Sequence, residues 1–216
     1  MEYSAFISYR RGGNQKTMES IARKFKELLC SRLRLKDKHH QVYLDLDDKE
    51  RGLEKSLATN LCNSGFLIVL YHRPYCQYED KDNPWCLREL ITFEEKAAKR
   101  EQFLVENDLH NVKMLIPILI DDEEIQPKCF ENVFSYTLDL TPIKPFNSSK
   151  NIKTIQKIVD YIHAKRDSIL KSTLREQLFE GCDKIDKLVD ADHHQIVSLM
   201  ERFNHFDKKS KPPKWS

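Results

Sequence analysis

The sequence predicts an α/β fold in which a five-stranded, mostly parallel sheet carries helices on both faces, followed by a C-terminal helical extension. Short apolar segments rich in β-forming residues alternate five times with longer segments whose apolar residues recur at helical spacing. One short segment, residues 66–71, is apolar throughout, as expected of a strand that is covered on both faces. The chain has 216 residues, of which 40% are hydrophobic, and this suffices for one domain with an appendage.

Two strands and two helices are predicted before the apolar segment at residues 66–71. Residues 3–9 combine apolar and β-forming side chains, and residues 41–47 do the same with acidic groups at their end. A shorter helix is predicted at 53–62, where Asn-Ser-Gly ends it. Apolar residues that recur every three or four positions predict a longer helix between the two strands: Met18, Ile21, Ala22, Phe25, Leu28, Leu29 and Leu33.

The second half of the chain adds a helix, two strands and a further helix. The helix begins near Trp85, and strands are predicted at residues 114–120 and 134–140. Pro117 lies within the first of these strands and has no backbone N–H, which favours an edge position or a local irregularity. The last helix is predicted from a row of branched residues at helical spacing: Ile152, Ile155, Ile158, Val159 and Ile162.

The sheet domain is expected to span residues 1–167, and residues 168–216 to form a helical extension with a basic tail. Two amphipathic stripes predict two helices in this extension. Packing against the sheet domain is the first interpretation, and a dimer or partner interface is the alternative. The stripes are Leu174, Leu178, Cys182, Ile185, Leu188 and Val189, and then Ile196, Val197, Met200 and Phe203.

Charge and hydropathy exclude several classes of function. The formal net charge is +2 and the charged residues are well mixed, so no concentrated basic face for nucleic acid is expected. The basic residues 208–214 are interpreted as a solvated tail. No apolar run approaches the ~18 residues that a membrane-spanning helix needs. A strand begins almost at Met1, which leaves no room for a secretory leader, and a cytoplasmic location is expected.

Cysteines and glycines exclude further classes of site. None of the six cysteines forms a C-x-x-C pair, and we interpret them as reduced thiols rather than as zinc ligands or a disulfide framework. The five glycines form neither a G-x-G-x-x-G motif nor a P-loop. An ordinary nucleotide cradle is therefore not expected.

A tryptophan and a glutamate near the middle of the chain form the strongest candidate site. Asn83 and Pro84 are typical of a helix start, which puts Trp85 and Glu89 four residues apart on one helix face. In parallel sheets, ligands bind outside the carboxyl ends of the strands. The segments predicted at that end are residues 9–11, 45–52 and 71–89.

Four motifs follow one another along the chain: residues 4–11, residues 42–45, residues 63–70, and Tyr75 with the later run Trp85-Cys86-Leu87-Arg88-Glu89-Leu90. In this order they resemble the first strand, the second strand, the helix-to-third-strand junction and the W-C-x-x-E-L signature of Toll/interleukin-1 receptor (TIR) domains. The resemblance covers residues 1–165 and implies the flavodoxin-like TIR fold. One departure is that Tyr71-His72 replaces the family's serine after the third strand.

The resemblance implies either an NAD⁺-cleaving enzyme or an adaptor. Many bacterial, plant and axonal TIR domains split the nicotinamide–ribose bond with the glutamate of this helix, so Glu89 is the expected catalytic residue. Nicotinamide leaves NAD⁺ neutral and without a proton, and one carboxylate can then suffice where an ordinary O-glycosidase uses two. Glu89 would hold the ribose hydroxyls and stabilise the oxocarbenium-like charge. No metal and no cofactor are expected, since NAD⁺ is the substrate.

The expected substrate-binding residues are Tyr9, Arg10, Arg11, Asp45 and Trp85. The tryptophan would pack beside the carboxylate, as a ring wall or as core support. The arginines follow the first strand, where their bidentate fork suits the pyrophosphate. Tyr9 and Tyr43 are the two strand tyrosines that could contact a base. The aspartate ends the second strand.

The short chain with its lone TIR-like domain is similar to prokaryotic antiphage-defence TIR NADases of Thoeris-like systems. These convert NAD⁺ into ADP-ribose or a cyclic ADP-ribose-type signal, sometimes for a separate effector. The resemblance also implies a homo-oligomer held by TIR–TIR contacts. One alternative is a non-catalytic TIR adaptor that acts by homotypic assembly. The other is an enzyme like the nucleoside deoxyribosyltransferases, which are also small α/β proteins with one essential glutamate.

Overall fold

The computed structural model describes residues 1–10, 15–44, 53–72, 75, 85–120, 130, 135–140, 146–171, 174–185, 187–189, 194–195 and 198–199, with the backbone alone at 15, 16 and 53. Five strands form one parallel sheet in the order β2-β1-β3-β4-β5. This is the flavodoxin-like order of a doubly wound α/β domain, and it confirms the predicted fold class. The strands are β1 (Tyr3–Tyr9), β2 (Val42–Leu44), β3 (Ser64–Tyr71), β4 (Leu115–Ile120) and β5 (Tyr136–Leu138).

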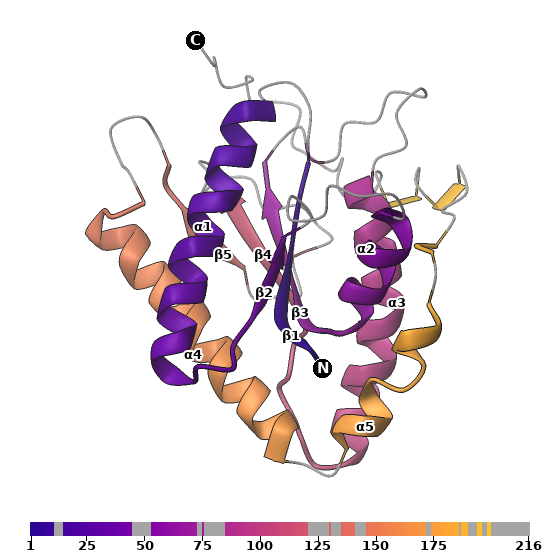
Figure 1. The fold of residues 1–216 in the computed structure, drawn as a ribbon. Helices are drawn as coiled ribbons and strands as arrows, with labels where there is room; N and C mark the ends of the chain where they lie inside the picture. The colour runs from indigo at the N-terminus through magenta and orange to yellow at the C-terminus, as the bar shows by residue number, and fades with distance from the viewer. Residues whose placement is uncertain are drawn as a thin grey trace.

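Long helices cover both faces of the sheet (Figure 1). α1 (Gln15–Lys36) and α4 (Ser149–Lys171) lie on one face, and α2 (Leu53–Cys62) and α3 (Trp85–Glu106) lie on the other. α1, α2 and α4 lie where the apolar periodicity of the sequence predicts helices, and α3 begins where Asn83 and Pro84 predict a helix start.

Alternation of side chains along the strands divides the core into two clusters, one on each face. In β1, Phe6 packs with residues of α2 and α3, whereas Ala5 and Ile7 pack with residues of α1 and α4. All eight residues of β3 are buried, which confirms a strand that is covered on both sides. The side chains of adjacent residues in one strand therefore point to opposite faces of the sheet, and this decides which of them reach the candidate site.

β4 is an interior strand, so the expected edge position of Pro117 is wrong. β4 lies between β3 and β5, and the edges of the sheet are β2 and β5. Pro117 is opposite Val69 in the ladder with β3. The ladder with β5 begins only at Ile118, so the missing N–H of the proline does not interrupt it.

The C-terminal segment packs on the sheet domain but does not form the long helix that its first apolar stripe predicts. A short helix α5 (Arg175–Leu178) and a 3-10 turn η4 (Cys182–Lys184) stand there instead. Gly181, between them, has a φ of 75°, a left-handed conformation that interrupts the helical path and that glycine adopts without strain. The second predicted helix lies largely outside the described residues. The apolar side chains that join the core cluster of α2 and α3 include Leu178, Cys182, Leu188 and Leu199.

Cys62 and Cys182 form a disulfide, so the interpretation of all six cysteines as reduced thiols is wrong for this pair. Cys62 ends α2 and Cys182 begins η4, and their Cα atoms lie 5.4 Å apart although 120 positions separate them in the sequence. The fold brings the two thiols together, and nothing in their spacing along the chain indicates it. Neither Cys30 nor Cys86 forms a disulfide among the described residues, and the remaining two cysteines lie outside them.

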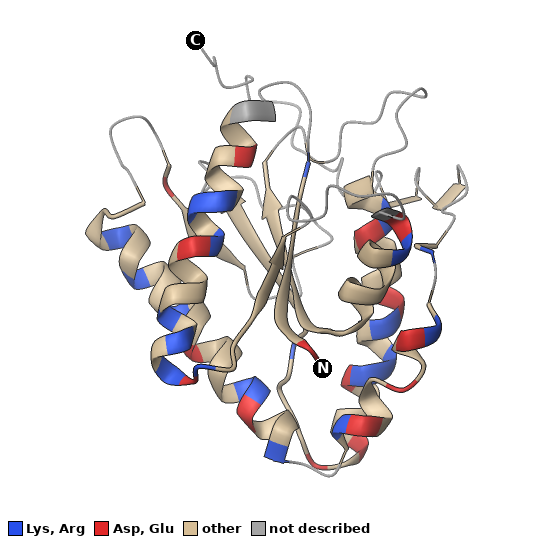
Figure 2. Ribbon diagram, viewed as in Figure 1, with Lys and Arg blue, Asp and Glu red and all other residues tan. Residues whose placement is uncertain are grey.

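Acidic and basic side chains are interspersed along α1, α3 and α4 (Figure 2). Some form pairs at helical spacing, such as Arg23 with Glu19 at 2.9 Å in α1. Within the part of the chain that the structure describes, no helix has both the length and the apolar character needed to cross a membrane.

Candidate functional site

Glu89 lies in the second turn of α3 and is only 2% exposed. The hydroxyl group of Ser8, in β1, donates a hydrogen bond of 2.6 Å to Oε2 of Glu89. Ser8 is the penultimate residue of its strand, so the carboxylate meets the sheet at the carboxyl end of β1. Doubly wound sheets bind their ligands at that end.

Tyr75 extends this contact into a chain of three polar groups. Its hydroxyl group lies 2.8 Å from Oγ of Ser8 and 3.1 Å from the backbone oxygen of Cys86, and it shares its one proton between these two acceptors because Ser8 donates its own to Glu89. Ser8, Tyr75 and Glu89 are all buried, and hydrogen bonds in such surroundings are stronger than in water. The chain of contacts therefore holds the carboxylate in a defined orientation.

The sequence predicts a binding role for Tyr9, but the structure brings its neighbour Ser8 to Glu89. Tyr9 is 5% exposed and belongs to the core cluster beneath α1 and α4, on the other face of the sheet. The signal that identifies Ser8 is the alternation of the strand, since it lies two residues after Phe6, which packs beneath α3. Tyr43 packs against the ring of Phe6, with ring centroids 5.0 Å apart.

Trp85 is the first residue of α3, and it is 38% exposed. The guanidinium carbon of Arg88 lies 4.9 Å from the centre of its ring, as a cation–π contact requires. Arg88 is itself buried, and it is held by the carboxylate of Glu54 and by the backbone oxygen of Val189 at 3.2 Å. Tryptophan is usually buried and glutamate usually exposed, whereas here Trp85 is exposed and Glu89 is buried. This reversal favours a binding role for this helix start.

Arg10 follows β1 and is half-buried, and its Nη1 atom is buried with no hydrogen-bond partner among the described residues. Its charge and that of Glu89 both act on the thiol of Cys86. Burial, with a smaller contribution from the charge of Glu89, raises the pKa of that thiol to about 12, although the charge of Arg10 opposes them. Arg10 and Glu89 are thus both within electrostatic range of this thiol. A thiol with such a pKa stays protonated near neutral pH, so Cys86 is unsuited to act as a nucleophile.

His72 follows β3, next to Arg10, and is 7% exposed. Burial and the charge of Arg10 lower the pKa of its ring to about 4, although a hydrogen bond to the Arg10 backbone opposes them. From the sequence, the only signal at this position is that Tyr71-His72 replaces the serine expected after the third strand from the resemblance to TIR domains. Its burial beside Arg10 becomes visible only in the fold.

Two expected binding residues, Arg11 and Asp45, lie outside the described residues, and their roles stay predictions. Within the described ranges, no three side chains of His, Cys, Asp or Glu are grouped so that they could hold a metal ion. The described part of the site therefore consists of one buried carboxylate, two hydroxyl groups, an arginine, a histidine and an exposed tryptophan.

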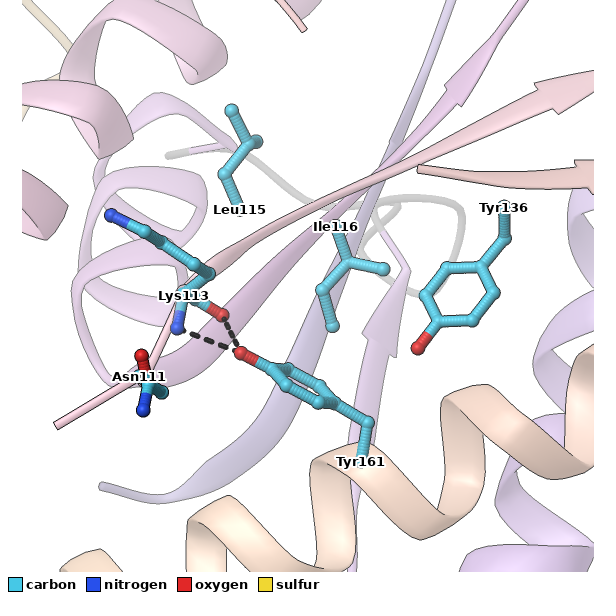
Figure 3. Close-up of a pocket in the computed structure, with 6 residues that line it drawn as sticks. All are labelled: Asn111, Lys113, Leu115, Ile116, Tyr136 and Tyr161. Atoms are coloured by element: carbon cyan, nitrogen blue, oxygen red, sulfur yellow. Dashed lines mark hydrogen bonds between the residues drawn. The ribbon is translucent and has the colours of Figure 1, made fainter. Parts of the chain in front are cut away.

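A separate pocket of about 180 Å³ opens at the opposite end of the sheet (Figure 3). Leu115 and Tyr136, which line it, are the first residues of β4 and β5, so the pocket lies at the amino ends of the strands. The hydroxyl group of Tyr161 reaches from α4 to the backbone nitrogen and oxygen of Lys113, at 2.7 and 2.9 Å (Figure 3). This pocket is distinct from the candidate site.

No protein-family model matches the sequence, and no curated protein matches it either. A solved structure of the TIR domains of the activated Roq1 resistosome, which directly recognizes the pathogen effector XopQ, is similar to this chain at 17% identity. The match covers 93% of this chain and 96% of that one, with a TM-score of 0.38. A likeness at that identity and score says nothing about the function of this chain.

Proposed function

We propose that the protein is a TIR-type NAD⁺ nucleosidase that cleaves the bond between nicotinamide and ribose. The observation that carries the proposal is the carboxylate of Glu89, buried at the carboxyl end of β1 and held by the hydroxyl group of Ser8 at 2.6 Å. A buried carboxylate in a fixed orientation at the ligand-binding end of the sheet suits a group that stabilises developing positive charge. The sequence motifs that resemble TIR domains supply the reaction class.

In the proposed reaction the glycosidic C–N bond breaks and its electron pair leaves with nicotinamide, which departs neutral. The ribosyl group then carries oxocarbenium-like positive charge, and the carboxylate of Glu89 stabilises it while it holds the ribose hydroxyls. Electrostatic attraction is stronger in a site of low dielectric constant than in water. Attack by water gives ADP-ribose and releases a proton. Attack by an adenine nitrogen of the same molecule gives a cyclic product.

Two further groups suit NAD⁺. Arg10 carries a buried Nη1 atom without a partner among the described residues, and a guanidinium is a fitting donor to a pyrophosphate oxygen. Trp85 presents an exposed ring at the start of the same helix as Glu89, where it can flank a planar base. Arg11 and Asp45 are proposed to complete the substrate contacts.

The product is proposed to act as an immune signal in antiphage defence, read by a separate effector, and the sequence resemblance is the support for this role. Homotypic assembly is proposed to complete the site across neighbouring subunits. Turnover per subunit then rises with protein concentration between nanomolar and high micromolar levels. A constant turnover per subunit over that range would contradict the assembly.

The decisive experiment follows nicotinamide release and adenine-containing products from NAD⁺ by chromatography, at high protein concentration. Glu89→Gln keeps the shape of the side chain but removes its charge, and we expect release to fall at least about 100-fold. Glu95→Gln is the matched control, because Glu95 lies on the same helix but is exposed. Equal activity of the two variants would refute the catalytic role.

A non-catalytic assembly module is the second candidate. The observation that favours it is that Glu89 is 2% exposed and hydrogen-bonded inside the protein, as a purely structural carboxylate would be. An assembly module would retain its function in the Glu89→Gln variant and release no nicotinamide. Deoxynucleosides belong in the same assay, since a preference for them over NAD⁺ would indicate a deoxyribosyltransferase-like enzyme.

A further inference from the structure

The carboxyl ends of β1 and β3 mark the point at which the chain changes faces. β1 leads to α1 on one face of the sheet, and β3 leads to α3 on the other (Figure 1). Doubly wound sheets bind ligands where neighbouring strands connect to opposite faces. Arg10 and His72 are the first residues beyond these two strands, so they border this point.

Two polar atoms at this point are buried and have no hydrogen bond within the part of the chain that the structure describes. Nε2 of His72 has no partner among the described residues, and the same holds for Nη1 of Arg10. His72 is itself 7% exposed, so its ring nitrogen is shielded from water by the surrounding protein. Buried polar atoms without a partner are rare in folded proteins, and each calls for an explanation such as a bound group.

The ring of His72 presents an acceptor at Nε2. Burial and the charge of Arg10 lower its pKa to about 4, so the ring is neutral at pH 7. A neutral imidazole carries one N–H proton. The hydrogen bond to the Arg10 backbone raises the pKa of the ring, which is the effect of a hydrogen bond that the ring donates. The nitrogen that donates is Nδ1, because Nε2 has no partner among the residues described, and Nε2 then keeps its lone pair.

We propose that His72 is a specificity-determining residue whose Nε2 accepts a hydrogen bond from an N–H donor on one of the two bases of the dinucleotide. The inference rests on the proposed function, in which Glu89 holds the ribose hydroxyls and Arg10 meets the pyrophosphate. The N–H donors that remain on NAD⁺ are the carboxamide of nicotinamide and the amino group of adenine. Both offer the same chemistry, so the experiment separates them.

Steady-state kinetics with three dinucleotides test the contact. NAD⁺ is compared with its acetylpyridine analogue, which lacks the carboxamide N–H, and with its hypoxanthine analogue, which lacks the adenine amino group. We expect His72→Ala to raise KM for NAD⁺ about tenfold, the effect of losing one hydrogen bond. For the analogue that lacks the contacted donor, His72→Ala should leave KM unchanged, because the wild-type protein cannot form that hydrogen bond with this analogue either.

His72→Gln is the conservative variant, because its amide oxygen places an acceptor near the position of Nε2. It should restore most of the affinity that His72→Ala loses. His110→Gln is the matched control, since the His110 side chain is 58% exposed. An unchanged KM in His72→Ala, or a rise of equal size for all three dinucleotides, would overturn the proposal.

A second measurement needs no turnover. The Glu89→Gln protein, labelled with ¹⁵N-histidine, is titrated with NAD⁺ at pH 7, and the Nε2 resonance of His72 is assigned by its absence in a His72→Gln variant. We expect an unprotonated nitrogen whose resonance moves on binding. The resonances of His40 should stay in place, because hydrogen bonds within the protein hold both of its ring nitrogens.

Nicotinamide release tests the proposed function, and the His72 resonance tests the His72 contact. If the wild-type protein releases no nicotinamide but the His72 resonance moves, the proposed function fails and the contact stands. If nicotinamide is released and the resonance does not move, the contact fails and the proposed function stands. A resonance that is unmoved at the highest attainable NAD⁺ concentration overturns the inference in either case.

Discussion

Oγ of Ser8 lies 2.6 Å from Oε2 of Glu89, although 81 positions separate the two residues in the sequence. The contact joins the end of β1 to the second turn of α3, and both residues are buried. A carboxylate removed from water is costly unless hydrogen-bond donors replace the solvent, and this hydroxyl group is such a donor. The pair therefore serves both the stability of the fold and the orientation of the proposed catalytic group.

Ser8→Ala removes the donor and leaves the carboxylate with one hydrogen bond fewer. We expect the free energy of unfolding to fall by about 2 kcal/mol, because hydrogen bonds to charged groups are the stronger ones. We also expect kcat for nicotinamide release to fall about 10- to 100-fold, because the carboxylate loses its orientation. Ser4→Ala is the matched control, since Ser4 is buried in the same strand but bonds Nδ1 of His40 at 2.7 Å. It should lower stability and spare kcat, and an equal loss of kcat in both variants would argue against the positioning role.

Arg88→Met tests the link between α3 and the C-terminal segment. The guanidinium of Arg88 contacts the carboxylate of Glu54 and the backbone oxygens of Leu188 and Val189, at 3.4 and 3.2 Å for the two oxygens. Its loss leaves these groups without their donor, and we expect urea unfolding to show a loss of about 2 kcal/mol. The control is Arg23→Met, whose partly exposed pair with Glu19 contributes at most about 0.5 kcal/mol. Similar losses in the two variants would contradict the burial of Arg88.

The disulfide predicts a dependence of stability on reductant. Peptide mapping without reduction should find Cys62 linked to Cys182. Reduction by a phosphine or dithiol should lower the free energy of unfolding by about 2–4 kcal/mol, because the link constrains the unfolded chain. A double variant with alanine at both positions should respond to reductant no further, whereas Cys30→Ser, at a cysteine outside this disulfide, should respond as the wild type does. A wild-type protein whose unfolding is the same with and without reductant would show that the link contributes nothing.

Buried histidines predict that stability falls on mild acidification. Burial and the charge of Arg166 lower the pKa of His40 to about 4, below the ordinary value of 6.5 that it has in the unfolded chain. Between these values the unfolded state binds more protons, so the free energy of unfolding decreases as pH falls from about 6.5 to about 4. His40 alone should account for about 2 kcal/mol by pH 5.

Urea unfolding between pH 5 and pH 8 measures this dependence. His72, with a similarly lowered pKa, adds to it, so His40→Gln should remove only part of the slope. His110→Gln, at a histidine whose side chain is 58% exposed, serves as the control substitution. A stability that is constant over this pH range would contradict the buried neutral state of both histidines.

Periodicity along the chain, together with the helix-start signal before Trp85, predicts the strands and helices of the sheet domain. Apolar residues at helical spacing placed α1 and α4, and uniform burial was expected and found for β3. The same reasoning failed in the C-terminal segment, where the apolar stripe is regular but Gly181 turns the chain. It also failed for Pro117, because a missing N–H does not reveal where the neighbouring strand begins to pair.

The sequence by itself determined the alternation of strands and helices, the parallel sheet, and the position of Glu89 on the helix at its ligand-binding end. Only the tertiary structure decided that Glu89 is buried against Ser8 rather than Tyr9, and that Trp85 is exposed. It alone decided that Cys62 meets Cys182. The physical reason is that periodicity is a local property, which assigns a side chain to a face of its own element. The partner it meets there comes from a distant part of the chain, and only the packing of the elements selects it.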